Sequence, residues 1–399
     1  MALFHKKGIV TDPEKVEAVL SRGVTEAIVK DALRAKLLSG KRLRIKFGVD
    51  PTSPDLHLGR AVPLLKLRDF QELGHQIVLI VGDFTALIGD TSDKDSERPM
   101  LSEEHVRTNK KTYVEQIGKL LDLKQTEVHY NTEWLEGLTY SAICEHADLF
   151  SIADFIAREN IKRRLDAGKR VSLREVLYPL MQGYDSVAIR ADVEVGGIDQ
   201  KFNLLAGRTM QEKIGLPAQD IVMGPLLIGL DGRKMSSSWG NTIPLTAAAQ
   251  DMYGKLMSIA DAQVSTYFEL CTRMPLEEIR QICTGHPKEA KMRLAYEITM
   301  LYHSKAAAEK AQQHFITAFS EGGIPEDIVT VSAPAGALLA TLLQDHGLVA
   351  SRSEFTRLVE QRAVQCVETG EKITDAHAVV SIESTYRIGK HRFIRFLIK

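Results

Sequence analysis

Two apolar, β-rich runs, RLRIKFG (42–48) and QIVLIVGD (76–83), limit the folds open to this chain. Between them LLKLRDFQELGH (64–75) places its apolar residues at helical spacing. A strand, a helix and a second strand buried on both faces form the βαβ unit of a parallel sheet. In such sheets ligands bind beyond the carboxyl ends of the strands. The residues that follow each run are therefore the first place to look for a site.

The same pattern recurs later in the first half of the chain. DVEVGG (192–197) and IVMGPLLIGL (221–230) are strand candidates around a helix predicted to begin near Gln200. A mostly helical insert, over about 102–175, separates the two halves. We therefore expect an α/β, Rossmann-like catalytic domain with a parallel sheet over residues 1–230.

The other segments are predicted to be mainly helical. Apolar residues recur at helical spacing in EKVEAVLSRGVTEAIVKDALRAKLLSG (14–40), which predicts one helix ending at Gly40. The Gly and Pro residues of EGGIPED (321–327) and SAPAG (332–336) are typical of linkers. We expect two further domains, an α-helical one over 231–330 and a small α+β one over 337–399.

Composition excludes some classes of protein. The chain has 399 residues, with 51 Lys and Arg against 52 Asp and Glu, so a polyanionic partner must be held by local basic patches. The apolar run IVLIV (77–81) is too short to span a membrane, and MALFHKKGIV (1–10) lacks a long apolar stretch. We expect a cytoplasmic protein without a structural metal, because its cysteines form no CxxC pair: Cys144, Cys271, Cys283 and Cys366.

DPTSPDLHLGR (50–60) lies where the first strand ends and a helix begins. His57 and Gly59 would occupy the first helical turn, where unpaired N–H groups attract phosphate. Gly59 has no side chain, so a nucleotide could approach the backbone closely. The alternative is structural: His57 caps the helix and Gly59 makes a packing contact.

LDGRKMSSSWGN (230–241) combines a lysine, Lys234, with a run of hydroxyl residues between two glycines. Such a loop suits a polyphosphate that is held only during reaction, although a solvated serine-rich loop is the simpler alternative. Taken together, HLG after the first strand and KMSSS after the last resemble the HIGH and KMSKS signatures of class I aminoacyl-tRNA synthetases. This resemblance implies that Ser236 and Ser237 contact ATP.

YPLMQGYDS (178–186) places Tyr178, Gln182 and Asp185 at positions i, i+4 and i+7 of a predicted helix whose first turn holds Pro179. Three polar groups then share one otherwise apolar face. They could form an internal hydrogen-bond network, since buried polar groups need partners. They could equally bind a small ligand that carries an ammonium and a hydroxyl.

This YxxxQxxD pattern, with GGIDQ (196–200), resembles the tyrosyl-tRNA synthetases more than their tryptophanyl relatives, over nearly the whole chain. The resemblance implies ATP-dependent attachment of L-tyrosine to tRNA(Tyr) through tyrosyl-adenylate. ATP would enter as its Mg²⁺ complex, and the protein would be a homodimer. The two rival interpretations are tryptophan specificity and an inactive homologue that only binds RNA.

The resemblance also assigns roles to individual residues. It implies that Asp185 binds the phenolic hydroxyl, and that the rest of the tyrosine contacts Asp90, Tyr178, Gln182 and Gln200. The catalytic candidates are Thr52, His57, Arg60 and Lys234. The ATP-binding candidates are Gly48, Asp50, His57, Gly59, Gly197, Asp199, Lys234, Ser236 and Ser237.

The chain departs from the family pattern at both signatures. Arg60 replaces the last histidine of the first signature, and Ser237 replaces a lysine of the second. Losing that lysine removes a positive charge, whereas Arg60 adds a permanent one whose planar fork can grip phosphate oxygens. We hypothesise that Arg60 compensates for Ser237.

Two further departures lie elsewhere. In GDTSDKDSERP (89–99), Thr91 and Asp93 replace the Pro and Gly of a GDPSGK-like segment. This makes its two cations, Lys94 and Arg98, weaker phosphate candidates. Lys46 stands where some tyrosyl enzymes have a tyrosine near the phenol.

The end of the chain carries a basic segment, RIGKHRFIRFLIK (387–399), with two interleaved phenylalanines. Together with SRSEFTRLVEQRAV (351–364) and GEKIT (370–374) it resembles an S4-like RNA-binding module, in which phosphate contacts give affinity. A run of charge is otherwise a solvated face. The resemblance to a synthetase favours RNA.

Overall fold

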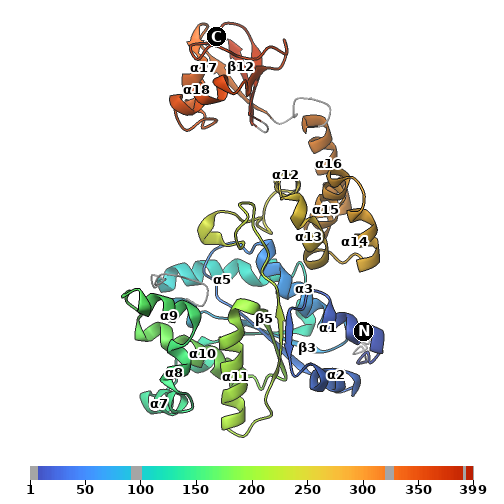
Figure 1. Cartoon of the computed structure of the whole chain (residues 1–399), viewed down its shortest axis with the longest axis vertical. Coiled ribbons are helices and arrows are strands. Elements are labelled where there is room, and N and C mark those ends of the chain that lie inside the picture. The colour runs from blue at the N-terminus through green and yellow to red at the C-terminus, as the bar shows by residue number, and fades with distance from the viewer. Residues whose placement is uncertain (1–7, 91–100, 320–327, 390–391, 399) are drawn as a thin grey trace, which may run out of the picture. The chain divides into compact units, whose positions relative to one another are not determined.

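The computed structural model describes residues 8–90, 101–319, 328–389 and 392–398 (Figure 1). The chain forms two compact units, 1–302 and 303–399. The predicted phosphate candidates Lys94 and Arg98, and the predicted linker EGGIPED, lie outside the described residues.

A six-stranded sheet in the order β1-β6-β5-β2-β3-β4 forms the centre of the first unit. β1 pairs antiparallel with β6, and the other neighbours are parallel. The predicted parallel βαβ unit is confirmed, because β2 and β3 pair in parallel with Ile45 opposite Ile77. The strands are β1 (Glu26–Ile28), β2 (Arg44–Val49), β3 (Gln76–Val81), β4 (Thr126–Tyr130), β5 (Val193–Gly197) and β6 (Asp220–Gly224).

Helices cover this sheet and continue beyond it. α3 packs against β2, β3 and β5, while α11 packs against β5, β6 and α10. The helices of the first unit are α1 (Pro13–Ser21), α2 (Lys30–Leu38), α3 (Leu58–Glu72), α4 (Thr85–Ile88), α5 (Glu103–Ile117), α6 (Thr132–Leu135), α7 (Tyr140–Asp148), α8 (Ile152–Ile156), α9 (Glu159–Asp166), α10 (Leu173–Ala188), α11 (Lys201–Lys213), α12 (Ala249–Met257), α13 (Val264–Cys271), α14 (Leu276–Cys283) and α15 (Pro287–Tyr302).

The structure corrects several predicted elements. The stretch 14–40 is not one helix: Gly23 adopts a positive φ of 59° after α1, and β1 then pairs with β6. The insert is mostly helical, and it also contributes β4 to the edge of the sheet, a strand that the sequence did not predict. The strand predicted over 221–230 ends at Gly224.

Pro179 does not lie in the first turn of its helix. α10 begins six residues earlier, where Ser172 and Glu175 form a capping box, and Pro179 lies inside the helix. The capping box therefore determines where α10 begins, and the proline does not mark the first turn of the helix. The spacing of Tyr178, Gln182 and Asp185 is unaffected, since all three remain on α10.

The second unit contains α16 (Lys305–Phe319) and a four-stranded sheet in the order β7-β12-β11-β9. Phe396 of β12 packs into the hydrophobic core of this unit, and Phe393, on the other face of the strand, is also buried. Ser332 and Ala333, predicted in a linker, belong to β7. The other elements are β7 (Val329–Ala333), β8 (Ala337–Leu338), α17 (Leu339–Asp345), α18 (Arg352–Glu360), β9 (Val364–Cys366), β10 (Val379–Val380), β11 (Ser384–Ile388) and β12 (Arg392–Ile398).

Candidate functional site

A cavity of about 980 Å³ lies at the carboxyl ends of β2 and β5. The sheet order places β3 on one side of β2 and β5 on the other, which makes this the switch point of the sheet. All sixteen residues predicted for the site line this one cavity: Gly48, Asp50, Thr52, His57, Gly59, Arg60, Asp90, Tyr178, Gln182, Asp185, Gly197, Asp199, Gln200, Lys234, Ser236 and Ser237.

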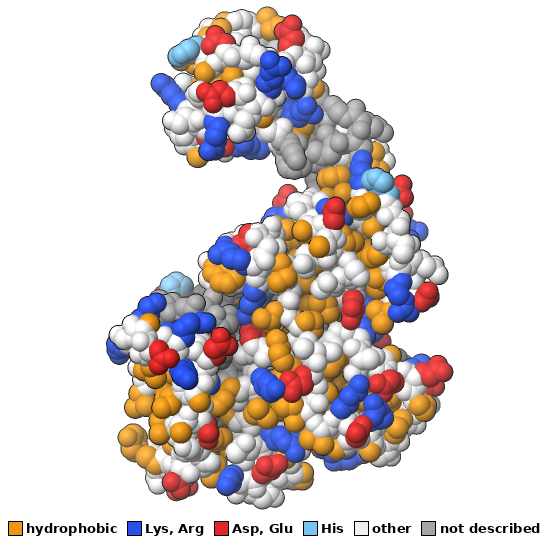
Figure 2. Space-filling view, in the orientation of Figure 1, with side chains coloured by type: hydrophobic (Ala, Val, Ile, Leu, Met, Phe, Trp, Pro, Cys, Tyr) orange, Lys and Arg blue, Asp and Glu red, His pale blue; other side chains and the backbone are white. Residues whose placement is uncertain are grey.

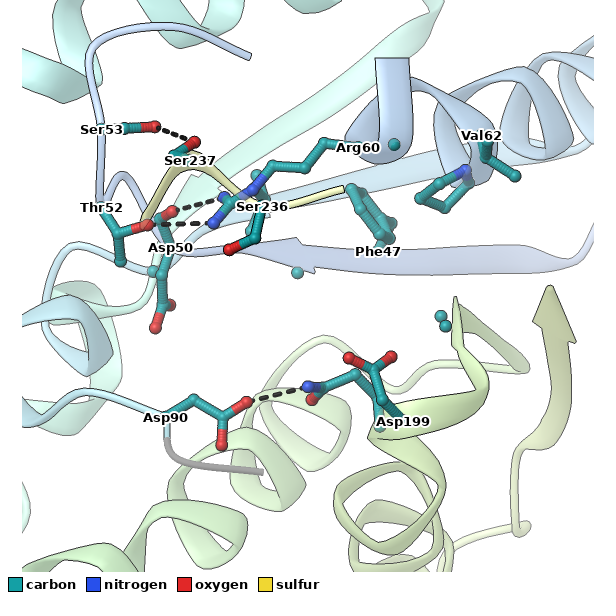
Figure 3. A pocket seen from close by; sticks show the side chains of 18 of the residues that line it. Phe47, Asp50, Thr52, Ser53, Arg60, Val62, Asp90, Asp199, Ser236 and Ser237 are labelled. Atoms are coloured by element: carbon teal, nitrogen blue, oxygen red, sulfur yellow. Dashed lines mark hydrogen bonds between the residues drawn. The ribbon is translucent and has the colours of Figure 1, made fainter. Parts of the chain in front are cut away.

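The turn after β2 sends one carboxylate into the cavity (Figure 3). Asp50 accepts hydrogen bonds from Thr85 Oγ1 at 2.7 Å and from the Tyr178 hydroxyl at 2.9 Å. Burial raises the pKa of Asp50 to about 6, against the opposing effect of these two donors. A Cβ added to Gly82 would collide with the Asp50 and Thr85 oxygens, so glycine is required there.

His57 is the N-cap residue of α3, but the described residues show no capping hydrogen bond from its side chain. Its buried Nδ1 has no partner among them either. Burial lowers the pKa of His57 to about 3, and the charges of Arg60 and Lys234 act in the same direction. The imidazole is therefore neutral at pH 7, with a polar atom available beside the cavity.

Gly59 packs closely against neighbouring side chains. A Cβ at this position would lie 3.1 Å from the His57 ring, and its N–H points at the sulfur of Met235 at 3.2 Å. The packing contact considered for Gly59 is thus present. Close packing and access to a ligand are compatible here, because the same residue lines the cavity.

Arg60 turns its guanidinium back onto the loop that follows β2 (Figure 3). One nitrogen donates to the Asp50 carbonyl and the other to Thr52 Oγ1, each at 2.9 Å. Ser237 approaches the same loop, where its hydroxyl lies 3.4 Å from that of Ser53. The two positions that depart from the family signatures therefore share one wall of the cavity.

The loop over 230–241 is held by its own polar groups. Asn241 accepts from the Ser236 N–H at 2.8 Å and donates to the Lys234 carbonyl at 3.0 Å. The Lys234 ammonium lies 2.7 Å from the Asp199 carboxylate. Two of the residues predicted to bind ATP are thus paired with each other.

Asp185 lies on α10 at the opposite end of the polar stripe, and only 3% of it is exposed. Trp134 Nε1 donates to its carboxylate at 2.8 Å, and Asn131 Nδ2 does so at 3.4 Å. Burial raises the pKa of Asp185 to about 7, although Lys46 opposes the shift. Sequence reasoning missed Trp134 and Asn131, because nothing in their local pattern marks them.

Asp90 and Gln200 meet across the cavity, where Gln200 Nε2 donates to the Asp90 carboxylate at 2.8 Å. The Gln200 side-chain oxygen in turn accepts from Asn203 Nδ2 at 3.0 Å. The resemblance assigns both Asp90 and Gln200 to the amino acid. They are neighbours in space although they are far apart in the sequence.

Glu194 is a further residue of the cavity wall that sequence reasoning missed. Its carboxylate lies 2.8 Å from the ammonium of Lys46, and both side chains are buried. The sequence marks Lys46 only as a departure from the family pattern. Within the described residues, no group of three or more His, Cys, Asp or Glu side chains is arranged to hold a metal ion.

Comparison with known proteins identifies the family. The family described as "tRNA synthetases class I (W and Y)" matches residues 38–320. The chain is 44% identical to a tyrosine--tRNA ligase of Shewanella oneidensis, over 97% of this chain and 99% of that protein. It is also 44% identical to one of Moorella thermoacetica, over 94% of each. The chain belongs to the tyrosine--tRNA ligase family.

Solved structures of tyrosyl-tRNA synthetases show the same fold. A C-terminally truncated mitochondrial enzyme of Aspergillus nidulans matches with a TM-score of 0.65 at 23% identity, over 76% of this chain and 94% of that one. An enzyme of Archaeoglobus fulgidus, complexed with L-tyrosine, gives 0.61 at 22% identity, over 75% and 100%. The predicted class I synthetase fold is confirmed at this level. In the described part of the chain, every helix is too short or too polar to cross a membrane.

Replacing Asp185 with asparagine should stabilise the ligand-free protein at neutral pH. Because its pKa is about 7 in the folded protein, folding favours the protonated form, and the ionised carboxylate opposes folding as pH rises from about 4 to 7. Urea unfolding should show a gain for Asp185→Asn on the order of 1–3 kcal/mol above pH 7 that shrinks towards pH 4. The exposed control Asp251→Asn should show no such trend; a gain independent of pH would contradict the assignment.

Proposed function

We propose that this chain attaches L-tyrosine to tRNA(Tyr) at the expense of ATP, through a tyrosyl-adenylate. The observation that carries the proposal is the single cavity in which Asp185 and Lys234 both take part. One end offers carboxylates and amides to an amino acid, and the other offers cations and a helix N-terminus to phosphates. Membership of the tyrosine--tRNA ligase family supports the same activity.

Asp185 selects the phenol in this proposal. Trp134 and Asn131 hold its carboxylate in place and leave it able to accept one more hydrogen bond from the substrate hydroxyl. Phenylalanine would bury the same carboxylate without that partner, which is costly. Tyr178, Gln182, Asp90 and Gln200 bind the ammonium and the rest of the amino acid.

The nucleotide lies across the other half of the cavity. Gly48, Gly59 and Gly197 let ATP approach the backbone, and Asp199 binds its ribose. Neutral His57 acts as a hydrogen-bond partner, whereas Arg60 and Lys234 supply positive charge to the phosphates. Asp50, Thr52, Ser236 and Ser237 line the same end, and Mg²⁺ enters as part of the substrate.

The reaction needs no covalent intermediate with the protein. A tyrosine carboxylate oxygen attacks the α-phosphorus of ATP, the bond from that phosphorus to the bridging oxygen breaks, and pyrophosphate leaves. A hydroxyl of the terminal adenosine of tRNA then attacks the activated carbonyl and releases AMP. Orientation of the two substrates and the cations on the developing charge provide the acceleration.

The second unit binds tRNA in this proposal, as an S4-like module within a domain over 337–399. β12 alternates between buried Phe396 and exposed Arg395, and α18 exposes Arg352 and Arg357 while it buries Phe355. Outward basic residues can contact phosphates, while the phenylalanines maintain the fold. The domain boundaries at 1–230 and 231–330, and the cytoplasmic location, stay predictions.

We also propose a homodimer. Hydrophobic side chains lie exposed around α7 to α9 and at the start of α10, in the part of the molecule where Figure 2 shows orange atoms over these helices. An apolar patch of this kind marks an interaction surface, and a second copy would bury it. The exposed residues are Tyr140, Ile143, Ile152, Ile156, Leu165 and Leu173.

Pyrophosphate exchange into ATP tests the activity directly. Tyrosine should support exchange, whereas tryptophan and phenylalanine should not at equal concentration, because neither offers a phenolic hydroxyl to Asp185. Charging of tRNA(Tyr) should follow. Exchange with tryptophan would replace the assigned specificity, and RNA binding without exchange would favour the inactive homologue.

A double-mutant cycle tests whether Arg60 compensates for Ser237. Both residues face the same loop, so Arg60→His and Ser237→Lys should be coupled in adenylate formation by about 1 kcal/mol or more. The matched control pairs Arg60→His with Ser238→Lys, one residue along the same loop. That pair should be additive; additivity in both cycles would dispose of the compensation.

Introducing charge at the exposed patch should separate the subunits. Leu173 is 67% exposed, and Leu173→Asp should weaken association on the order of 100-fold in sedimentation experiments, since a charge is costly in a buried interface. Ile214→Asp places the same charge at an exposed apolar residue after α11 and should leave association unchanged. A monomeric unaltered protein would refute the homodimer.

A further inference from the structure

A buried ion pair lies under the end of the cavity that is assigned to the phenol. Lys46 is 0% exposed and Glu194 is 1% exposed, and their charged groups are 2.8 Å apart. Two charges cost free energy when they leave water, and their mutual attraction often does no more than offset that cost. Stability alone is therefore a weak reason for the pair, and its surroundings suggest another.

The pair sits where the sheet opens. β2 and β5 pair in register only at Ile45 with Val193 and at Lys46 with Glu194. The residues beyond this point on both strands line the cavity, and Glu194 itself is part of the wall. The last residue pair between these strands therefore adjoins the cavity through Glu194.

Lys46 and Glu194 both form hydrogen bonds with α10, at residues before and after Asp185 in the sequence. The Lys46 ammonium donates to the Gln182 carbonyl at 2.9 Å and to the Ser186 hydroxyl at 2.7 Å. Glu194 accepts from Gln182 Nε2 at 3.3 Å and from the same Ser186 hydroxyl at 3.1 Å. Gln219 Nε2 donates at 2.5 Å to the same Glu194 oxygen that accepts from Ser186. The residues three before and one after Asp185 are therefore fixed by this pair.

The charges under the cavity do not balance if every group is ionised. Asp185 and Glu194 are both almost fully buried carboxylates, and Lys46 is the buried cation that faces both. Glu194 holds that cation at 2.8 Å, while Asp185 is held by the neutral donors Trp134 and Asn131. Lys46 favours the ionised form of Asp185, and the negative charge of Glu194 offsets part of that effect.

We propose that Lys46 and Glu194 act together as a positioning pair for tyrosine recognition. The pair fixes Gln182 and the turn of α10 that carries Asp185. It also sets the pH range in which Asp185 is an ionised acceptor for the substrate hydroxyl. This inference rests on the proposed function and adds two residues that the family signatures do not include.

Other charged groups near Asp185 come from each neighbouring element. On its own helix there is Tyr178, whose hydroxyl is bonded to Asp50 at the ammonium end. Beyond Trp134 lies His129, at 5.9 Å between ring centroids. Behind Gln219 lie Arg208 and Asp220, and Asp220 pairs in turn with Lys36 at 2.7 Å. All remain unchanged in the variants below, so differences between those variants report on the pair.

Two single variants should move the pH dependence of tyrosine binding in opposite directions. Glu194→Gln removes a negative charge, so the Lys46 ammonium then interacts with Asp185 as the remaining one of these two buried carboxylates and favours its ionised form. The acid limb of the binding profile, which is the range where tyrosine affinity falls as pH is lowered, should therefore move to lower pH. Lys46→Met removes the positive charge, so the limb should move to higher pH, and tyrosine affinity at pH 7 should fall about tenfold or more. Each movement should be on the order of one pH unit.

The measurement is calorimetric tyrosine binding between pH 5.5 and 9, with the KM values for tyrosine and ATP from exchange. The KM for ATP should stay within about twofold, because the pair lies at the amino-acid end. The double variant Lys46→Met with Glu194→Gln removes both charges without leaving one unpaired. It should fold even if Lys46→Met does not, with its acid limb near the original position and weaker tyrosine binding.

A second buried ion pair provides the control. Arg164 and Glu175 lie 2.6 Å apart, with Glu175 in the first turn of α10. Arg164→Met should lower stability and leave the acid limb in place. Movement of the limb in the same direction in both single variants, or none, would reduce Lys46 and Glu194 to a structural pair. Failure of the unaltered protein to bind tyrosine or support exchange would instead overturn the proposed function, and this inference with it.

Discussion

The separation of β2 from β5 is the constraint on which the site depends. These strands pair in register at only two positions, and beyond Lys46 and Glu194 their carboxyl ends diverge around the cavity. The residues that are proposed to bind the substrates all line this cavity. α3 brings the phosphate end, α10 brings the amino-acid end, and the loop after β6 brings Lys234. A ligand could not fit between strands that stayed paired.

Charge is distributed along the cavity in a way that opposes stability and serves binding. Burial raises the pKa of Asp50 to about 6 and that of Asp185 to about 7, so the hydrogen-bond donors around these carboxylates do not fully offset the cost of burying their charge. At the other end burial keeps His57 neutral, and Arg60 and Lys234 carry the positive charge. In the proposed function, the ammonium and hydroxyl of tyrosine satisfy one end of the cavity and the polyphosphate of ATP satisfies the other.

Local patterns in the sequence predicted the residues whose neighbours are also close in the chain. Tyr178, Gln182 and Asp185 followed from helical spacing alone, and the parallel βαβ unit followed from two apolar runs. Pro179 misled because a capping box earlier in the chain determines where α10 starts. The single helix expected over 14–40 failed because sheet pairing by β1 outweighed a helical pattern.

Residues whose roles depend on distant partners could not be predicted in this way. Trp134 and Asn131 reach Asp185 from the insert, and Glu194 meets Lys46 only because β2 and β5 are neighbours in the sheet. Phe393 and Phe396 show the same limit: the sequence places both in a basic segment, but Phe396 packs into the core of the second unit, and Phe393, on the other face of β12, is also buried. Periodicity predicts which residues share one face of a helix or strand, but the fold determines which other residues that face contacts.

In the proposed compensation, Arg60 departs from its signature and yet supplies the positive charge that the second signature lacks. Its guanidinium is held by hydrogen bonds to the Asp50 carbonyl and to Thr52. A lysine on a loop would have to be ordered when substrate arrives, at a cost in side-chain entropy. Because the arginine is held beforehand and its planar group has donors to spare, it can present charge to a phosphate with little reorganisation. Moving the charge from the loop to a helix thus exchanges a mobile contact for a preorganised one.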